Sequence, residues 1–326
     1  MRAKIALPIW VVLFVCAWGY AADFASEWEE LTSRSLYLEF ADKNQARIVN
    51  LTNIDALERS EILGLEVSGA SLADWSTLGS RFTNVVYLRI TSSATDLPAT
   101  FFSAITNYPR LEYLHLQCRE ALAVPPYVNL LTNLPHLKYL GIDVPSASDI
   151  AGGIYQIGTL KELFLVVGAV NLPDGVAKLP ELIRIEIHGK RATPVRSLPA
   201  DFPKCRIQRL AVANMPGVEK LLPVLPPDLI ELSVLNCQLR AIPAPWLRMQ
   251  KLRLIDLSNN ELARFPSDLL GLMTLKLVGL DLNRITAVPP LGVAGNRQLK
   301  ISLVANPIRH FAPENELLLQ RGIIEK

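Results

Sequence analysis

The stretch LRLIDLSNNELARFP, residues 252–266, combines a short apolar alternation with an asparagine that follows it. Leu252, Ile255 and Leu257 have the spacing of a short strand with one buried face. Asn260 comes three residues after that strand, where a side-chain amide can bond to backbone groups left open by a turn. The same arrangement returns 23 residues later in LKLVGLDLNRITAVP, residues 275–289. A period of this length indicates a stack of small structural units.

The pattern LxxLxLxxNxLxxLP continues in both directions along the chain. A third copy follows at the same spacing and contains Ile301, and earlier copies occur at spacings of 22 to 26 residues. We count eleven units between residues 62 and 313, of which the first ten open at Ile62, Val85, Leu111, Leu137, Leu160, Leu182, Ile207, Leu229, Leu252 and Leu275.

This repeat resembles the leucine-rich repeat family, in the class whose variable half begins with LP. The resemblance implies an α/β solenoid over 62–313, a horseshoe with a parallel β-sheet on its concave face, and a function in recognition. The physical argument agrees, because one unit cannot bury its leucines alone and stacked units bury them between layers.

The residue that follows each strand is predicted to be structural. An asparagine at this place can bond to the backbone of neighbouring turns, and a small buried cysteine can take the same place. We therefore expect an Asn/Cys ladder of Cys237, Asn260, Asn283 and Asn306.

The N-terminus has the features of a cleaved secretion signal over residues 1–21. Arg2 and Lys4 precede an apolar run, and small residues stand at Gly19 and Ala21 before the cleavage point. Two alternatives stay open: an uncleaved membrane anchor over residues 5–22, and lipid modification of Cys16, which is disfavoured because a bulky valine precedes it. The sequence thus predicts a secreted or periplasmic protein that touches a membrane only if the signal is uncleaved.

The two ends of the stack need lids, which we expect at 22–61 and 314–326. In the first we predict a helix capped by Ser26 and then a strand through Leu36, Leu38 and Phe40. In the second, PENELLLQRGIIEK is predicted to form a short amphipathic helix. Asn50 begins the sequence Asn-Leu-Thr and is a candidate glycosylation site in a eukaryotic secretory route.

The charge balance gives no sign of a nucleic-acid partner. The chain has 33 basic and 31 acidic residues, and removal of Arg2 and Lys4 with the signal leaves 31 of each. Motifs for serine hydrolases, zinc proteases, phosphate loops and redox cysteine pairs are missing from the sequence. The sequence predicts a protein that is no enzyme and needs no cofactor.

A metal site is also disfavoured. His115 and His188 should face the same side of the sheet, but they are three layers apart, which corresponds to roughly 14 Å. Cys118 and Asp143 lie near His115 in the predicted register, yet three such residues make a poor ligand set. We predict no metal site.

The residues between the core leucines should line up across layers on the concave face. In this register Tyr87, Tyr113 and Tyr139 form an aromatic stripe, and Arg89, His115 and Phe164 lie in the adjoining row, with Gly141 as a depression. Aromatic rings beside an arginine are typical anchors of protein interfaces. The predicted partner-binding patch is therefore Tyr87, Arg89, Tyr113, His115, Tyr139 and Phe164.

Two other interpretations of this patch remain. Tyrosines favour strands and stack on one another without a partner. A carbohydrate or peptide could also stack on the tyrosine stripe, and a further alternative for the whole chain is a membrane-anchored adhesion protein. The charged layers that follow, from Glu162 to Glu231, are expected to neutralise one another.

Overall fold

The computed structural model describes residues 35–50, 61–68, 81–93, 95, 97, 99–118, 120–147, 149–168, 171–190, 196–292 and 298–326. The predicted signal at 1–21, the alternative anchor at 5–22 and the predicted helix at Ser26 lie outside these residues, as does the side chain of Asn50. Contacts divide the chain into Met1–Arg34 and Ser35–Lys326, and all described residues belong to the second unit.

One parallel sheet runs through the described part of the chain, and its strands follow the sequence order without a crossover. Its 13 strands are β1 (Ile48–Asn50), β2 (Gly64–Ser68), β3 (Tyr87–Ser92), β4 (Tyr113–Cys118), β6 (Tyr139–Val144), β8 (Glu162–Val167), β9 (Arg184–His188), β10 (Arg209–Ala213), β11 (Glu231–Leu235), β12 (Leu254–Asp256), β13 (Leu277–Gly279), β15 (Lys300–Ser302) and β17 (Ile324–Glu325).

The predicted register is confirmed along the sheet. Gly64 pairs with Tyr87, which pairs with Tyr113, and the same row continues to Lys300 in β15. The leucine row beside it points the other way, because successive strand residues alternate between faces. This row forms the core, and each member is at most 3% exposed: Leu65, Leu88, Leu114, Leu140, Leu163, Ile185, Leu210, Leu232, Ile255, Val278, Ile301 and Ile324.

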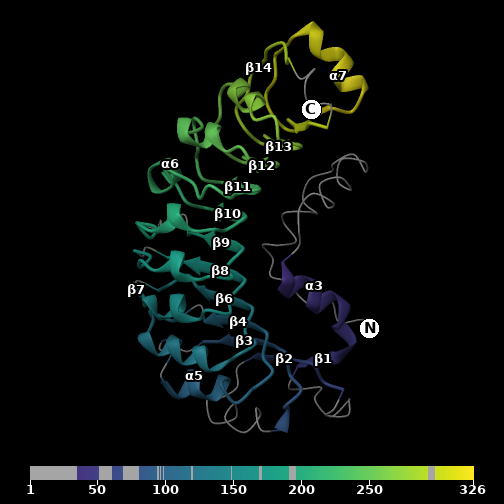
Figure 1. Ribbon diagram of the computed structural model, residues 1–326. Coiled ribbons are helices and arrows are strands. Elements are labelled where there is room, and N and C mark those ends of the chain that lie inside the picture. Colours follow the sequence, from purple (N-terminus) through teal and green to yellow (C-terminus); the bar gives the residue numbers. More distant parts are fainter. Residues whose placement is uncertain are drawn as a thin grey trace. The chain divides into compact units, whose positions relative to one another are not determined.

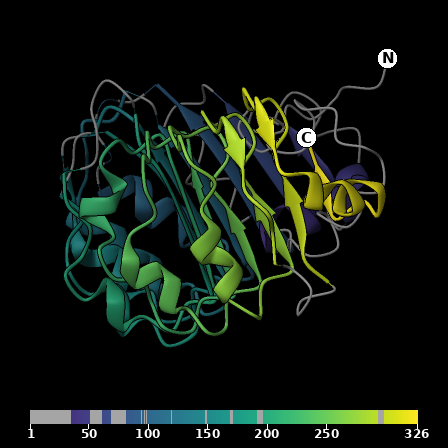
Figure 2. The same cartoon turned by 90° about the horizontal axis from the view of Figure 1, so that it is seen from above.

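Short helices cover the other side of this core. They are α5 (Ala99–Ile105), α6 (Val218–Leu221) and the 3₁₀ turns η3 (Pro126–Asn133), η4 (Gly152–Gln156), η5 (Val176–Lys178), η6 (Phe202–Lys204), η7 (Ala244–Arg248) and η8 (Ser267–Gly271). Figure 2 shows the strands of successive repeats behind one another, with these turns across the core from them. Two small parallel sheets join neighbouring repeats. One pairs β5 (Ala123–Val124) with β7 (Asp149–Ile150), and the other pairs β14 (Ala287–Val288) with β16 (His310–Phe311).

Residues from the two terminal segments extend the sheet by one strand at each end. In the C-terminal segment, η10 (Pro313–Asn315) and α7 (Glu316–Gln320) precede β17, which pairs with β15. In the N-terminal segment, α3 (Leu36–Lys43) and η1 (Gln45–Arg47) precede β1, which pairs with β2. The terminal strands thus continue the backbone pairing of the repeats beyond the eleven units.

The predicted strand through Leu36, Leu38 and Phe40 is wrong, because these residues belong to helix α3. The helix begins after Ser35, whose hydroxyl accepts a hydrogen bond from the backbone N–H of Tyr37 at 3.3 Å. Its buried residues are Tyr37, Leu38 and Ala41, a spacing that fits one face of a helix. The apolar alternation at 36–40 is compatible with both structures, and tertiary packing decides between them.

The Asn/Cys residues lie in the turns that follow the C-terminal strands. Asn283 accepts a hydrogen bond from Leu262 N at 3.0 Å, and its amide donates to the carbonyls of Leu257 and Leu280 at 2.9 Å each. Asn260 and Asn306 make equivalent bonds. The Cys237 thiol is buried and lies 3.2 Å from the Leu235 carbonyl. The asparagine side chains satisfy backbone groups in the turns after the strands, where backbone bonds between layers also continue.

Candidate functional site on the concave face

The six residues of the predicted patch lie side by side on four consecutive strands, β3, β4, β6 and β8. Tyr87 pairs with Tyr113 and Tyr113 with Tyr139, while Arg89 pairs with His115 in the adjoining row. The adjoining row continues through Gly141 to Phe164. The sequence therefore predicted which side chains are neighbours.

Helix α3 lies on this patch, and Figure 1 shows it on the opposite side of the sheet from α5 and α6. The ring of Tyr37 stacks on Tyr139, with ring centroids 4.6 Å apart, and on Tyr87, with centroids 5.0 Å apart. It also lies 5.4 Å from the ring of His115. The hydroxyl of Tyr87 donates a hydrogen bond to the hydroxyl of Tyr37 at 2.7 Å. Tyr37 thus occupies a cage of three rings from β3, β4 and β6.

A second ring of the same helix extends this contact. Phe40 stacks on Tyr113 with centroids 4.9 Å apart, and its centroid lies 6.0 Å from that of Tyr87. As a result the patch rings are buried, with exposed fractions from 2% for Tyr87 to 9% for Tyr113. The sequence predicted that these rings lie on an open surface, and it did not predict α3. The contacts between α3 and the sheet join residues far apart in sequence, so no local pattern indicates them.

Glu162 of β8 binds the N-terminal end of α3. Its carboxylate accepts a hydrogen bond from the Ser35 hydroxyl at 2.7 Å and one from the backbone N–H of Leu36 at 3.0 Å. A carboxylate is favoured at this place because the N-terminus of a helix carries partial positive charge. The side chain is nevertheless buried, and loss of solvent raises the pKa of Glu162 despite these bonds.

His115 fills the depression that the sequence predicted at Gly141. Its Nδ1 lies 3.1 Å from the Tyr139 hydroxyl. A side chain added at Gly141 would overlap the His115 ring and would come within 2.8 Å of the Tyr139 hydroxyl. Burial, helped by the charge of Arg89, lowers the pKa of His115 to about 3. His115 is therefore a neutral packing residue at physiological pH, and the predicted depression is closed.

The charged layers beside the patch pair with one another as expected. Arg184 lies 3.3 Å from Glu186 and 3.7 Å from Glu231, and Arg209 lies 3.1 Å from Glu231. All four side chains are between 12% and 25% exposed, so these ion pairs are shielded only in part from water.

Cys118 and His115 lie on opposite faces of β4. Cys118 is buried in the hydrophobic core, and burial raises its pKa to about 12. Asp143 instead lies next to Gln117, whose amide donates a hydrogen bond to it at 2.9 Å. Within the described ranges, no group of three or more His, Cys, Asp or Glu side chains is arranged to hold a metal ion.

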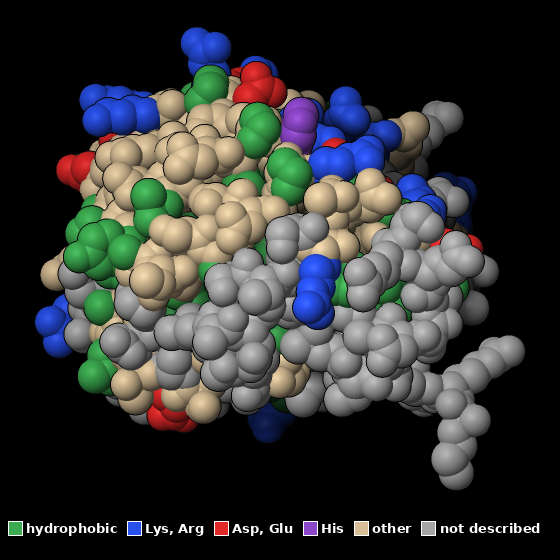
Figure 3. All heavy atoms as spheres, turned by 90° about the horizontal axis from the view of Figure 1, so that it is seen from below, with side chains coloured by type: hydrophobic (Ala, Val, Ile, Leu, Met, Phe, Trp, Pro, Cys, Tyr) green, Lys and Arg blue, Asp and Glu red, His purple; other side chains and the backbone are tan. Residues whose placement is uncertain are grey.

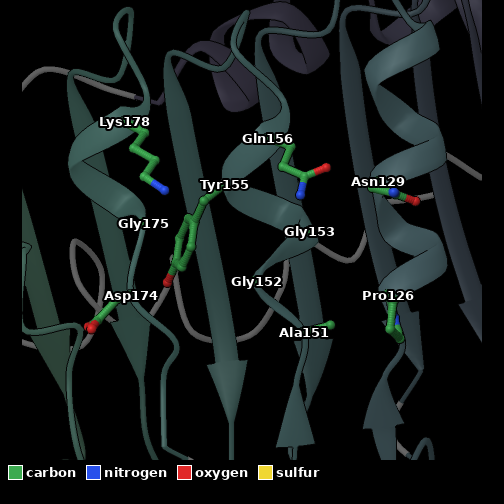
Figure 4. Close-up of a pocket in the computed structure, with 10 residues that line it drawn as sticks. All are labelled: Pro126, Asn129, Ala151, Gly152, Gly153, Tyr155, Gln156, Asp174, Gly175 and Lys178. Carbon is green, nitrogen blue, oxygen red and sulfur yellow. The ribbon is translucent and has the colours of Figure 1, made fainter.

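A separate groove of about 420 Å³ lies on the helical side, between η3, η4 and η5. Asn129, Gln156 and Lys178 project from these three turns, and Tyr155 lies between Gln156 and Lys178 (Figure 4). Burial raises the pKa of Tyr155, so its hydroxyl stays protonated. Asp174 also lines the groove, and its carboxylate accepts a hydrogen bond from the backbone N–H of Ala200.

Charge and hydrophobicity are dispersed on the face drawn in Figure 3. Its described hydrophobic side chains form small separate groups, and basic and acidic side chains are scattered around them. Among the described residues, none of the helices has the length and apolar character required to span a membrane.

The fold is that of known repeat proteins. No protein-family model matches the chain, and a search of curated proteins gave no match either. Among solved structures, an internalin from Listeria monocytogenes is similar, with 16% identity over 80% of this chain and 69% of that chain and a TM-score of 0.50. The Toll–Spatzle complex of Drosophila has 15% identity over 79% of this chain and 42% of that chain, also with a TM-score of 0.50. These likenesses and the sheet confirm the predicted leucine-rich repeat solenoid.

Proposed function

We propose that this chain recognises a protein partner through the concave face of its solenoid, centred on β3, β4, β6 and β8. The contact between α3 and the patch is the observation that carries this proposal. In it a helix binds the patch through stacked rings and through a carboxylate at its N-terminal end. A surface that binds one helix by side-chain contacts has the chemistry to bind another.

The composition of the patch supports the proposal. Tyrosine, phenylalanine and arginine are enriched in the cores of protein interfaces, and tyrosine and arginine are frequent among the residues that dominate binding energy. The solved structure of Toll with Spatzle gives a precedent, in which a protein of this fold is in complex with a protein. We extend that mode of action to this chain as part of the proposal.

We also propose that the protein acts outside the cytoplasm after cleavage of residues 1–21, and that binding is not coupled to catalysis. The buried thiols support the second point, because burial raises the pKa values of Cys118, Cys205 and Cys237 to about 12 each, which removes reactive thiolates at neutral pH. The mass of the protein purified from its native environment tests the first point. A chain that begins at Met1 in membranes would contradict secretion and favour the anchored alternative.

Site-directed photocrosslinking tests the concave face directly. Benzoylphenylalanine replaces Tyr113, the most exposed ring of the patch at 9%, or Tyr127 on η3, which is 50% exposed and serves as the control on the helical side. Each full-length variant is irradiated in its native environment, after circular dichroism has shown that it is folded. We expect a protein crosslinked to position 113 and none crosslinked to position 127.

The opposite pattern would refute the proposal. A protein crosslinked only at position 127 would place recognition on the helical side. A glycan crosslinked at position 113 would favour the carbohydrate alternative.

A further inference from the structure

We propose that α3 is an internal competitor for the protein-binding patch, and that the partner presents an amphipathic helix with two aromatic residues three positions apart. This inference rests on the proposed function, since it describes the partner of that same surface. It has two parts, the release of α3 and the chemistry of the helix that replaces it.

Helix α3 is separate from the hydrophobic core of the solenoid, which favours its release. The hydrophobic core cluster includes Val49 and the leucine rows, but none of the buried residues of α3 belongs to it. The patch rings Tyr87, Tyr113 and Tyr139 are also outside that cluster. The interface between α3 and the patch is therefore a second apolar layer, and opening it leaves the core of the repeats intact.

The helix also has low intrinsic stability, which favours its release. It has 8 residues, and isolated helices of that length are marginal in water. Its outer side is exposed to solvent, since the Lys43 side chain is 75% exposed and that of Glu39 is 43% exposed. Gln45, Ala46 and Arg47, which form the turn η1 after Asn44, are exposed as well. Contacts with the patch are what hold α3 folded, and a competing helix would remove those contacts.

The contacts of α3 define what a competing helix needs. The first aromatic residue enters the cage of Tyr87, His115 and Tyr139, as Tyr37 does. The second lies three positions later and stacks on Tyr113, as Phe40 does. These spacings place both rings on one face of a helix.

Glu162 fixes the direction of that helix. Its carboxylate accepts a hydrogen bond from the hydroxyl of Ser35 and another from the first backbone N–H of the helix. A partner helix that begins with Ser or Thr, with its N-terminus toward β8, reproduces both bonds. The sequence pattern of the partner is therefore Ser or Thr, one residue, an aromatic, two residues and a second aromatic.

Competition within one chain has a measurable consequence. A tethered segment has an effective concentration of order millimolar, so α3 weakens the binding of any external helix. The apparent affinity equals the intrinsic affinity multiplied by the fraction of molecules whose patch is free. Substitutions that weaken α3 should therefore strengthen binding of an external copy of the same helix.

The test uses the full chain and a labelled peptide of residues 35–44, with blocked ends, measured by fluorescence anisotropy. We compare the wild type with Tyr37→Ser/Phe40→Ser, which removes both rings of α3, and with Gln45→Ser, at an exposed position beyond the end of the helix, as control. We expect the peptide to bind the double variant about tenfold or more tightly than the wild type or the control. A peptide that carries the same two serine substitutions should not bind.

A further variant distinguishes recognition of the helix N-terminus from non-specific hydrophobic binding. Glu162→Gln, added to the double variant, keeps the shape of the side chain but removes its charge, and peptide binding should weaken about fivefold. Equal peptide binding to the wild type and the double variant, or no binding to a double variant with a native circular dichroism spectrum, would overturn the inference.

Hydrogen exchange of the wild type gives a readout that does not depend on variants. Backbone amides of α3 should exchange faster than those of β4 and β6, and excess unlabelled peptide should accelerate the exchange of α3 further. Exchange of α3 at the rate of the core strands would overturn the inference.

The crosslinking experiment and the peptide experiment can fail separately. Loss of peptide binding with a protein still crosslinked at position 113 would remove the competitor inference and leave concave recognition in place. Peptide binding with a protein crosslinked only at position 127 would show that the patch accepts a helix, and would remove the proposed function.

Discussion

The strands β3, β4, β6 and β8 are six residues long, whereas β12, β13 and β15 are three residues long. The residue that comes after each strand differs as well. In the short strands Asn260, Asn283 and Asn306 bond to the carbonyls beyond the strand. In the described long-strand layers the same place holds Ser93, Pro145 or Gly168. Backbone bonds between layers continue past the short strands as well, from Leu257 N to Gly279 O and from Asn259 N to Asp281 O, and the asparagine amides add to this pairing.

The two regions also differ on the concave face. The long strands carry the aromatic patch and the contacts of α3. The patch residues lie at the first and third positions of these strands, and the same positions are paired in the short strands. The short strands carry no tyrosine in the corresponding rows, which hold Leu254, Leu277 and Lys300. The regular repeats are thus stabilised by the asparagines in their turns. The candidate site lies in repeats whose turns lack that asparagine.

The substitution Asn283→Ala should have the largest effect on this comparison. It leaves the Leu262 amide and the carbonyls of Leu257 and Leu280 without the Asn283 side chain, and the free energy of unfolding should fall by about 3 kcal/mol. Urea denaturation followed by circular dichroism measures the loss. Asn129→Ala, at an exposed position on η3, is the control and should change it by less than about 0.5 kcal/mol. Equal losses would show that the asparagine ladder is not what stabilises the short-strand region.

The sequence predicted the repeats, the register and the neighbours within the patch, because strand alternation and a constant period fix which residues align. It could not predict α3, since the alternation of Leu36, Leu38 and Phe40 fits a strand as well. Glu162 was predicted to belong to the charged layers, and its role as a helix cap depends on a contact across 126 residues that no local pattern records. Asn315 was missed for a similar reason: it bonds to Leu291 and Pro289 as a ladder asparagine would, but no apolar strand pattern precedes it.

The substitution Gly141→Ala tests how tightly the long-strand region is packed. The added methyl group would overlap the His115 ring and crowd the Tyr139 hydroxyl, so we expect a loss of about 1–3 kcal/mol in the free energy of unfolding. Gly158→Ala is the matched control, because no atom lies within 4 Å of the added group. A near-neutral Gly141→Ala, measured in the same urea experiment, would mean that the patch has room for a ligand beside His115.

Acid should destabilise the patch through His115. Its folded pKa is about 3 against an ordinary value of 6.5, so below pH 6.5 the unfolded chain takes up a proton that the folded chain does not. Stability should fall by up to about 1.4 kcal/mol per pH unit as the pH drops from 6.5 toward 3. The charge of Arg89 also lowers the pKa of His115, and the rings of Tyr37 and Tyr139 lie against the His115 ring. Glu162 opposes the loss of stability, because its pKa is raised in the folded chain.

The contribution of His115 is measured as a difference between proteins, in which the effect of Glu162 cancels. Urea denaturation of the wild type and of His115→Asn over pH 4 to 7 should show a flatter pH dependence for the variant. His136→Asn, at an exposed position, is the control for the replacement of an imidazole by an amide. Identical slopes for the wild type and His115→Asn would mean that His115 is protonated in the folded chain and that the patch is wetter than its burial indicates.

The smallest effect is expected at Leu282, which comes just before the ladder residue Asn283. The backbone of Leu282 has φ +53°, and the equivalent residues Asn214, Asn236 and Asn259 have nearly the same φ. Asparagine adopts this left-handed conformation more easily than leucine, so Leu282→Asn should raise the free energy of unfolding by about 0.5–1 kcal/mol. The reverse change, Asn259→Leu, should lower it by a similar amount. Urea denaturation measures both changes. If Leu282→Asn brings no gain in the free energy of unfolding, packing of the half-buried leucine side chain offsets the cost of its backbone conformation. The turns of the short-strand region would then carry no net backbone strain.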